Sequence, residues 1–388
     1  MNAASALDLF GALAAAAEES GRPGPAALIG DWCDADAVIA PSLTLVPGLR
    51  PPDRPDRFWF GYLGFPVRGD QGTLPPVVGG LTDGILVLRD GRWSWESPVG
   101  APPPAWLPPL TPRAPEANDW STSWTSPERD PHLTAIAACR DAIAAGEVYQ
   151  ACICTRFTGR LDGAAHRYFA DLAAATTPAK AAFLQGEWGA VASLSPETFL
   201  SRRGSTVSSS PIKGTAPRSE DPMVLAQSVK DIAENVMIVD LVRNDLGRVA
   251  RTGTVRVPEL LTVVGAPGVW HLVSTVVAEL DDTVGNDALL EAAFPPASVT
   301  GTPKIRAAEL IAEWETHPRG VYCGAVGIAG PDGLLDLNVA IRTVTVAPDG
   351  ALTLGVGGGI TYDSEPAAEW QECLDKAASI LAHTRAPH

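Results

Sequence analysis

The 388-residue sequence lacks the features of several large protein classes. Basic residues are few, with 29 Lys and Arg against 45 Asp and Glu, and the net charge is −16. Such a chain cannot easily present a basic face to nucleic acid. No apolar run reaches membrane-spanning length, and the alanine-rich residues 1–20 lack the positive start of a signal peptide. We therefore expect a cytoplasmic protein.

Cysteine and histidine are also too sparse for a disulfide framework or a zinc fold. Of the six cysteines, only Cys152 and Cys154 are close in sequence, and no histidine completes a zinc-ligand spacing near them. We expect all six to be reduced and to serve as packing residues.

The common phosphate-binding glycine motifs are missing as well. The run Gly355-Val356-Gly357-Gly358-Gly359 is followed by Ile360, where a dinucleotide fingerprint needs a glycine, and no Gly-Lys-Ser/Thr occurs. Consecutive glycines expose backbone N–H groups that can bind an anion, although a bulge or a tight hairpin is the simpler explanation.

What the chain does contain is many short apolar strands separated by hairpin-type turns such as Asp90-Gly91, which predicts an α+β fold with largely antiparallel sheets. Helices are expected at residues 131–145, 226–243, 304–315 and 366–382, and strands at 58–65, 85–89, 92–95, 148–157, 183–184, 190–194, 198–202, 205–209, 269–280, 321–328, 335–346 and 351–356. Seven prolines in residues 101–118 indicate a linker, which predicts an N-terminal α+β lobe at 1–118 and a catalytic domain at 119–388.

A single lysine, Lys213, lies between Ile212 and Gly214 in the stretch Ser208–Arg218. A lysine sheltered from water can act as an amine nucleophile, whereas a salt bridge at a strand end is the structural alternative. Glu197 comes sixteen residues earlier, across one hairpin, and would supply a proton donor to the same substrate.

Three glutamates on two expected helices form a second constellation. Glu369 and Glu372 are three residues apart and share a helix face, with Lys376 one turn further, and Glu234 borders an apolar helix face. Carboxylates brought together from two helices suit Mg²⁺, which takes a few carboxylates plus water and substrate oxygens. A solvated Glu–Lys helix face is the alternative for the second helix.

Three further polar residues stand out in apolar surroundings. Arg342 lies inside an apolar strand, where an arginine usually pairs with a carboxylate. His271 is a candidate general acid or a satisfied core histidine. The segment Thr300–Lys304 opens a helix, whose N-terminus favours anions.

Together these segments resemble the chorismate-utilising enzymes, the family of the anthranilate, isochorismate, salicylate and aminodeoxychorismate synthases. The resemblance spans about residues 130–383. It rests on Ser195–Glu197, Pro211–Thr215, Ala233–Gly247, His271–Ser274, Ser298–Arg306, Gly320–Gly327, Ile341–Thr343, Gly357–Gly359 and Ala368–Ala377. It implies an anthranilate-synthase-like, two-lobed sandwich with helices outside.

Within this family, lysine at position 213 is similar to the aminodeoxychorismate synthases, whereas alanine there is typical of anthranilate and isochorismate synthases. The resemblance implies that Lys213 attacks C2 of chorismate while Glu197 protonates the departing C4 hydroxyl. Ammonia then enters at C4 and expels the lysine, which gives 4-amino-4-deoxychorismate, the precursor of p-aminobenzoate and folate. Direct addition of ammonia or water at C2, as in anthranilate or isochorismate synthases, is the alternative.

The resemblance also assigns the other site residues. It implies Mg²⁺ bound by Glu234 and Glu372, with Glu369 direct or through water, and a ring pocket that includes His271. The residues expected to bind the substrate are Thr300, Gly301, Lys304, Tyr322, Arg342, Gly357, Gly358 and Lys376. Two departures from the family pattern, Pro296-Ala297 and Ala151-Cys152, touch neither the acid, the nucleophile nor the metal positions.

No cysteine lies in the Gly-x-Cys-x-Gly setting of a glutamine amidotransferase nucleophile. We therefore expect ammonia from a separate glutamine amidotransferase subunit. A catalytically inactive, chorismate-binding subunit is a third possibility, which the presence of Glu197, Lys213, Glu234 and Glu372 disfavours. A generic magnesium-dependent hydrolase is disfavoured because no His/Asp cluster is available to activate water.

Overall fold

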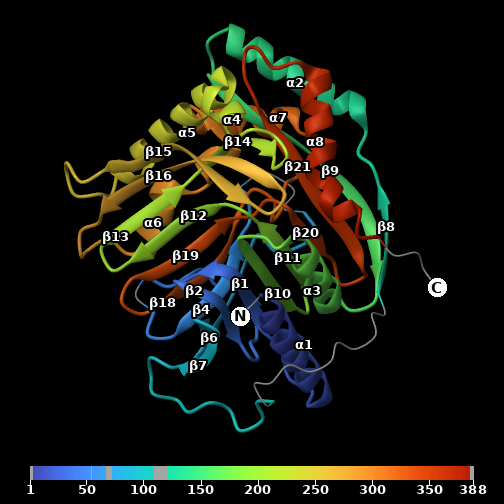
Figure 1. The fold of residues 1–388 in the computed structure, drawn as a ribbon, viewed down its shortest axis with the longest axis vertical. Coiled ribbons are helices and arrows are strands. Elements are labelled where there is room, and N and C mark those ends of the chain that lie inside the picture. The colour runs from blue at the N-terminus through green and yellow to red at the C-terminus, as the bar shows by residue number, and fades with distance from the viewer. Residues whose placement is uncertain (1–2, 54, 67–71, 109–119, 385–388) are drawn as a thin grey trace.

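A computed structural model describes residues 3–53, 55–66, 72–108 and 120–384 (Figure 1). It has two β-sheets with helices on their outer faces, and every strand pair in the described residues is antiparallel. The predicted α+β class with antiparallel sheets is confirmed. No helix in the described ranges is long and apolar enough to cross a membrane.

The first sheet has eleven strands in the order β17-β9-β21-β20-β11-β10-β1-β2-β6-β7, with β8 paired to β9. Its strands are β1 (Ala26–Trp32), β2 (Ala35–Ala40), β6 (Ile85–Arg89), β7 (Arg92–Glu96), β8 (Ser121–Thr125), β9 (Gln150–Asp162), β10 (Lys180–Gly186), β11 (Gly189–Ser195), β17 (Gly301–Thr302), β20 (Thr343–Val346) and β21 (Ala351–Ile360).

The second sheet has ten strands in the order β14-β16-β13-β12-β19-β18-β4-β5-β3, with β15 paired to β16. Its strands are β3 (Val46–Pro47), β4 (Phe58–Leu63), β5 (Val77–Thr82), β12 (Thr198–Arg203), β13 (Thr206–Ser210), β14 (Ile212–Pro217), β15 (Arg256–Ala266), β16 (Val269–Glu279), β18 (Ala325–Gly330) and β19 (Leu334–Val339).

The helices cover the outer faces of this sandwich. They are α1 (Ala3–Glu19), α2 (Arg129–Ala144), α3 (Ala165–Thr176), α4 (Met223–Gln227), α5 (Val229–Gly247), α6 (Asn286–Ala293), α7 (Lys304–Trp314), α8 (Pro366–Leu381) and the 3₁₀ turn at Ala297–Val299. Apolar residues of α1, α3 and α8 pack on the first sheet, and those of α5 and α6 pack on the second. A further core lies between the sheets, so strands such as β4 are apolar along their whole length.

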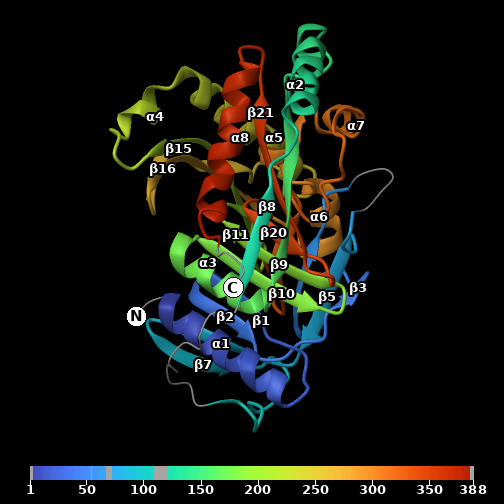
Figure 2. The ribbon, with the colours of Figure 1, turned by 90° about the vertical axis from the view of Figure 1, so that its right-hand side faces the viewer.

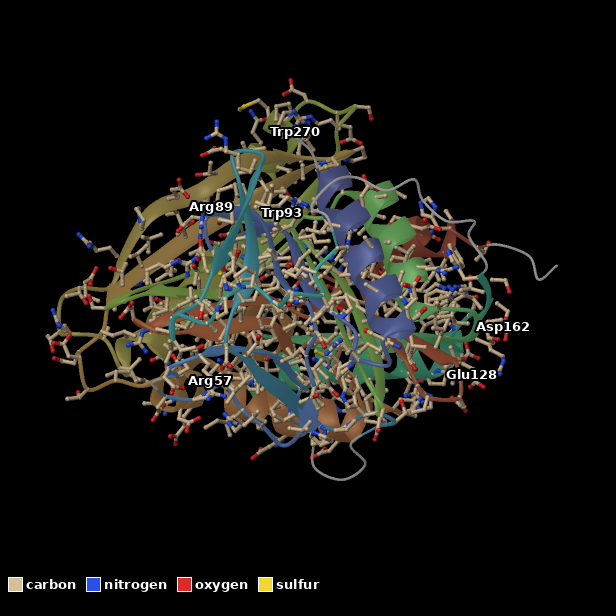
Figure 3. All side chains as sticks on the ribbon, turned by 90° about the horizontal axis from the view of Figure 1, so that it is seen from below. Arg57, Arg89, Trp93, Glu128, Asp162 and Trp270 are labelled. Atoms are coloured by element: carbon tan, nitrogen blue, oxygen red, sulfur yellow. The ribbon has the colours of Figure 1, made fainter. Side chains whose placement is uncertain are left out.

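The N-terminal strands belong to both sheets. β1, β2, β6 and β7 extend the first sheet beyond β10, and β3, β4 and β5 extend the second beyond β18. Arg89 and Trp93 of the β6–β7 hairpin lie at the same end of the molecule as α1 (Figure 3). Residues 109–119 of the proposed linker lie outside the described part, and the boundary at residue 118 stays a prediction.

Three predicted elements have different bounds in the structure. The helix expected at 226–243 is two helices, because Ser228 is extended and its hydroxyl accepts a hydrogen bond from the Asp231 N–H at the start of α5. The strand expected at 335–346 breaks into β19 and β20 at Arg342, whose φ is +49°. The strand expected from Val321 begins only at Ala325, after a turn.

A buried ion pair joins the two sheets at their centre. Lys180 Nζ on β10 lies 2.8 Å from Asp336 Oδ1 on β19, and the two side chains are 4% and 3% exposed. The ammonium also donates to the Asp31 carbonyl at 2.6 Å and lies over the Trp32 ring. Asp336 Oδ2 accepts a further bond from the Cys33 N–H. Both charges are therefore compensated away from water, as burial requires.

Removal of one partner of this pair is predicted to destabilise the protein strongly. Lys180→Met leaves the buried Asp336 carboxylate with only the more distant Arg203, 3.6 Å from its Oδ2, and should cost about 3–5 kcal/mol, whereas Lys180→Met/Asp336→Leu should recover part of that loss. Urea unfolding monitored by tryptophan fluorescence gives the midpoints.

The matched control is the exposed pair Arg243–Asp240 on α5, where Arg243→Met should change stability by less than about 1 kcal/mol. Equal losses in the single and double variants would show that the pairing itself is unimportant.

Candidate active site

The three glycines of Gly357–Gly359 form a regular part of β21, where they pair with Cys154, Ile153 and Cys152 of β9. None has a positive φ, so the bulge or hairpin that the sequence favoured is wrong. Figure 2 shows α8 running along β21 at the end of the molecule that also holds α2. With no side chain on β21 here, groups of other elements approach the strand closely, and the space that they enter is called the hollow below.

Three polar groups from three elements meet at Gly359. A Cβ placed on this residue would lie 3.1 Å from Lys213 Nζ, 3.2 Å from Gln150 Oε1 and 3.5 Å from Glu234 Oε2. Lys213 comes from β14, Gln150 starts β9, and Glu234 lies on the second turn of α5. The nucleophile and the first metal ligand that the sequence predicted are therefore brought together.

The second and third glutamates meet at Gly358, next along the strand. A Cβ there would lie 3.1 Å from Glu369 Oε2, 3.8 Å from Lys376 Nζ and 3.9 Å from Glu372 Oε1. All three side chains come from α8, which begins at Pro366 in the first helical position. The spacing on one helix face that the sequence indicated thus points these groups at the glycine strand.

Lys213 is half-buried rather than enclosed. In the described residues no carboxylate lies within ion-pair distance of its Nζ, although Glu197, Glu234 and Glu372 are near enough to interact with it electrostatically. Gly214, next to it, has φ +90°, and a side chain there would collide with Asp231 of α5. The glycine therefore permits the close approach of β14 to α5.

Glu197 is 4% exposed. Burial raises the pKa of its carboxyl to about 7, although the Ser298 hydroxyl, the Lys213 ammonium and the Ile212 N–H all favour the ionised form. A carboxyl with a pKa near neutrality is suited to give up a proton at physiological pH. Lys213 is thus close enough to Glu197 to stabilise the ionised form of this carboxyl.

The glutamates carry charge that is only partly compensated. Burial raises the pKa of Glu234, and the nearby Lys213 and Lys230 ammonium groups oppose that rise. Glu234 Oε1 is buried and has no hydrogen-bond partner. Across the described residues, no three His, Cys, Asp or Glu side chains are already arranged to hold a metal ion.

Arg342 and Tyr322 lie near one another behind the hollow. Arg342 is half-buried, and no ion pair joins it to a carboxylate of the described chain, which contradicts the partner expected from the sequence. The Tyr322 ring packs against Gly355 of β21, and burial raises the pKa of its phenol. A cationic guanidinium without a protein carboxylate is available for an anionic ligand.

Three further residues expected to bind the substrate are Lys376, Thr300 and Gly301. Lys376 Nζ contacts Glu372 Oε1 and the Gly357 carbonyl, both at 2.7 Å, so it borders the hollow. Thr300 is 1% exposed, and its hydroxyl donates to the Pro296 carbonyl at 2.8 Å. Gly301 pairs with Ala151 of β9.

Lys304 is used by the protein itself. Its ammonium contacts Asp245 Oδ2 at 2.6 Å and the carbonyls of Ala293 and Pro295 at 2.8 and 2.9 Å. An ammonium has three N–H groups, so none is left for a ligand. The geometry therefore does not support the substrate contact expected for Lys304, which instead fixes the loop before α7.

His271 lies on β16 opposite β14, and its Nδ1 is 2.9 Å from Thr215 Oγ1. Burial, together with the nearby Arg342 charge, lowers the pKa of the imidazole to about 4. The ring is therefore neutral at pH 7, which argues against an imidazolium acid and leaves a neutral hydrogen-bonding role.

Sequence reasoning missed three residues of this site. Gln150 is 2% exposed and its Oε1 has no partner, Ser298 contacts Glu197, and Lys230 lies 3.1 Å from Glu369 Oε1. Only Lys230 gave a usable signal, because it precedes Glu234 by four residues on the same helix. The other two are placed by chain segments distant in sequence.

A separate hollow of about 680 Å³ lies between α5 and β15 and is lined mainly by apolar residues such as Val236, Met237 and Leu260. None of the predicted site residues lines it. The convergence of lysines and carboxylates at β21 is therefore the candidate active site.

Comparison with known proteins agrees with this geometry. The model of a family described as chorismate binding enzyme matches residues 95–382. Aminodeoxychorismate synthase component 1 of Klebsiella aerogenes is 40% identical over 330 residues, which cover 81% of this chain and 72% of that protein. Anthranilate synthase component 1 of Streptomyces coelicolor is 41% identical over 281 residues, or 69% of this chain and 54% of that protein.

Among solved structures, anthranilate synthase component I of Streptococcus pneumoniae aligns with a TM-score of 0.72 and 25% identity, covering 86% of this chain and 82% of the other. The anthranilate-synthase-like sandwich expected from the sequence is thereby confirmed. The family model, the relatives and the fold agree, and this chain belongs to the chorismate binding enzyme family.

Proposed function

We propose that this chain is an aminodeoxychorismate synthase component 1, which converts chorismate and ammonia into 4-amino-4-deoxychorismate. The observation that carries the proposal is Lys213, whose Nζ and the Glu234 carboxylate both lie next to Gly359. The similar identities to an aminodeoxychorismate synthase and an anthranilate synthase, 40% and 41%, do not separate the two activities. The lysine does, because attack at C2 by an amine of the protein directs ammonia to C4.

In the proposed reaction, Lys213 Nζ forms a bond to C2 of the ring while the C4–O bond breaks. Glu197 gives its proton to the departing hydroxyl, which leaves as water. Ammonia then bonds to C4, the C2–N bond to the lysine breaks and restores the amine of Lys213, and the new C4 ammonium returns a proton to the Glu197 carboxylate. The net change is ammonia in place of the C4 hydroxyl, with one water released.

Glu197 fits the acid role because burial keeps its carboxyl protonated over a useful range. Its pKa of about 7 means that about half of the molecules hold the proton at pH 7. Ser298 and Lys213 stabilise the ionised carboxylate that remains after the transfer. His271, neutral and bonded to Thr215, is proposed to line the ring pocket rather than to supply the proton.

The glutamates are proposed to hold Mg²⁺. Their oxygen donors suit this cation, and the buried Glu234 Oε1 that lacks a hydrogen-bond partner is an unfilled ligand position. Glu234 and Glu372 would bind directly, and Glu369 directly or through water. When bound, the cation would neutralise a substrate carboxylate that these three glutamates would otherwise repel.

The substrate carboxylates are proposed to bind to Arg342, Lys376 and Tyr322, together with the backbone of Gly357 and Gly358. Thr300 and Gly301 are proposed to line the ring pocket, and Gly301 is held there by its pairing with Ala151 of β9. Ammonia is proposed to come from a separate glutamine amidotransferase subunit. The product leads to p-aminobenzoate and folate in this proposal.

Replacement of the proposed nucleophile tests the reaction directly. With chorismate, Mg²⁺ and an ammonium salt, the native chain should form 4-amino-4-deoxychorismate, and Lys213→Ala should reduce this product by at least about 100-fold. Product identity is read by liquid chromatography and mass spectrometry. Without ammonia, the native protein should also gain the mass of chorismate less one water, and the alanine variant should not.

Arg243→Ala, on the exposed face of α5, is the control for expression and folding. Formation of anthranilate or isochorismate by the native chain would contradict the proposed function and leave only the family assignment.

The pH dependence tests Glu197. Because the protonated form is the active one, kcat/KM for chorismate at saturating ammonia should fall as pH rises through about 7. Ser298→Ala removes a hydrogen bond that favours the carboxylate, so it should raise the Glu197 pKa and move this limb to higher pH. Glu197→Gln should lower kcat/KM by about 10²–10⁴-fold and abolish the limb. If kcat/KM of Ser298→Ala fell at the same pH as that of the native chain, the titration would belong to another group.

The glycine hollow is tested by filling it. Gly359→Ala introduces a methyl group about where Lys213 Nζ, Gln150 and Glu234 converge, at 3.1–3.5 Å. The backbone there is an ordinary strand, so the variant should fold while activity falls by about 100-fold or more. Gly247→Ala, with no atom within 4 Å of the added carbon, is the control. Retained activity in Gly359→Ala would place the reaction elsewhere.

A further inference from the structure

Lys230 is a cation at the site that the proposed reaction does not use. It lies on the first turn of α5, and its Nζ is 3.1 Å from Glu369 Oε1 and 4.0 Å from Glu234 Oε1. The lysine side chain is 48% exposed, whereas those of Glu369 and Glu234 are 3% and 10% exposed. The ammonium therefore covers two buried carboxylates, one from α5 and one from α8, from the solvent side.

The two carboxylates are satisfied unequally. Glu369 Oε1 accepts hydrogen bonds from both Lys230 Nζ and the Ser364 hydroxyl, the latter at 2.7 Å. Glu234 Oε1 has no hydrogen-bond partner. At 4.0 Å, Lys230 attracts this oxygen electrostatically but is too distant to bond to it. The lysine thus compensates the charge of the pair and leaves one ligand position unfilled.

The other two lysines around the hollow are placed differently. Lys376 is fixed by two contacts of 2.7 Å, to Glu372 and to the Gly357 carbonyl. Lys213 projects at Gly359 from β14. Lys230 has the exposed side chain and the long contact, and its neighbour Val229 is 83% exposed, so the side chain has open space into which it can swing.

The Oε2 atoms of Glu369 and Glu234 face the glycine strand, whereas Lys230 lies on their Oε1 atoms, so a divalent cation that also took the Oε1 atoms would compete with this ammonium. Mg²⁺ binds carboxylate oxygens at about 2.0–2.1 Å, so a cation that bound Glu369 Oε1 and Glu234 Oε1 would lie within contact distance of Lys230 Nζ. Two positive groups at that separation repel, and Glu369 Oε1 is already an acceptor for the lysine. A cation bound to both Oε1 atoms would therefore have to displace the ammonium.

We propose that Lys230 is an internal counter-ion that holds the Glu234–Glu369 pair in the metal-free chain and is displaced when Mg²⁺ binds. This inference rests on the magnesium site of the proposed function. The exchange lowers the affinity of the substrate-free chain for Mg²⁺, since the metal must replace a cation that is already there. The ammonium also keeps α5 and α8 together without metal, because it prevents repulsion between their buried carboxylates.

Calorimetric titration of the substrate-free chain with Mg²⁺ tests the displacement. Lys230→Met should bind Mg²⁺ about tenfold more tightly than the native chain, because one competing charge is gone. Lys230→Arg keeps the charge and should bind as weakly as the native chain does. Arg243→Met, which removes a cation from the same helix away from the glutamates, should leave the affinity unchanged. Unchanged or weaker binding by Lys230→Met overturns the inference.

Thermal unfolding supplies a readout that needs no bound metal. In EDTA, Lys230→Met should melt at a lower temperature than the native chain and than Arg243→Met, because the glutamate pair loses its counter-ion. Added Mg²⁺ should then raise the melting temperature of Lys230→Met more than that of the native chain. Identical melting of Lys230→Met and the native chain in EDTA contradicts the counter-ion role.

The two proposals fail in distinguishable ways. If the native chain forms 4-amino-4-deoxychorismate with Mg²⁺ and Lys230→Met binds the metal no more tightly, only the inference on Lys230 is lost. If neither the native chain nor any variant binds Mg²⁺, both the magnesium site and the role of Lys230 are overturned.

Discussion

The absence of side chains at Gly358 and Gly359 is the constraint on which the candidate site depends. In a sheet covered by helices, each strand position normally carries a side chain that fills the space next to it. Here the two glycines, paired with Ile153 and Cys152 of β9 in a regular ladder, leave that space to side chains of other elements. Three lysines, three glutamates and Gln150 fill the surroundings of the vacated volume, which no single element could have placed there.

Charge balance follows from that convergence. Burial favours the neutral forms of Glu197 and Glu234, and the neighbouring lysines favour the charged forms. Because the two effects oppose each other, a proton donor and a cation-binding carboxylate can coexist near one amine. The three lysines differ in their contacts. Lys376 is held by two short contacts, Lys230 covers a pair of carboxylates, and Lys213 has no ion pair in the described chain.

The site is supported by the whole sandwich. β9 and β21 belong to the first sheet and β14 to the second, so the distance between Lys213 and the glycines is set by how the two sheets pack. The Lys180–Asp336 pair joins those sheets through β10 and β19, and the N-terminal strands complete both of them. The N-terminal and C-terminal segments therefore belong to the same two sheets, whatever part each of them has in function.

The sequence by itself determined the fold class and the family, and it nominated most of the groups that are proposed to react. The spacing of Glu369, Glu372 and Lys376 placed them on one helix face, and the residues around Lys213 indicated a nucleophile, because local periodicity and short motifs depend only on neighbours in the chain. Tertiary structure decided the rest. It brought Gln150, Ser298 and Lys230 to the site, gave all three N–H groups of Lys304 to protein oxygens, and left Arg342 without a carboxylate. Those outcomes depend on contacts between segments far apart in the chain and on burial, neither of which a local pattern encodes.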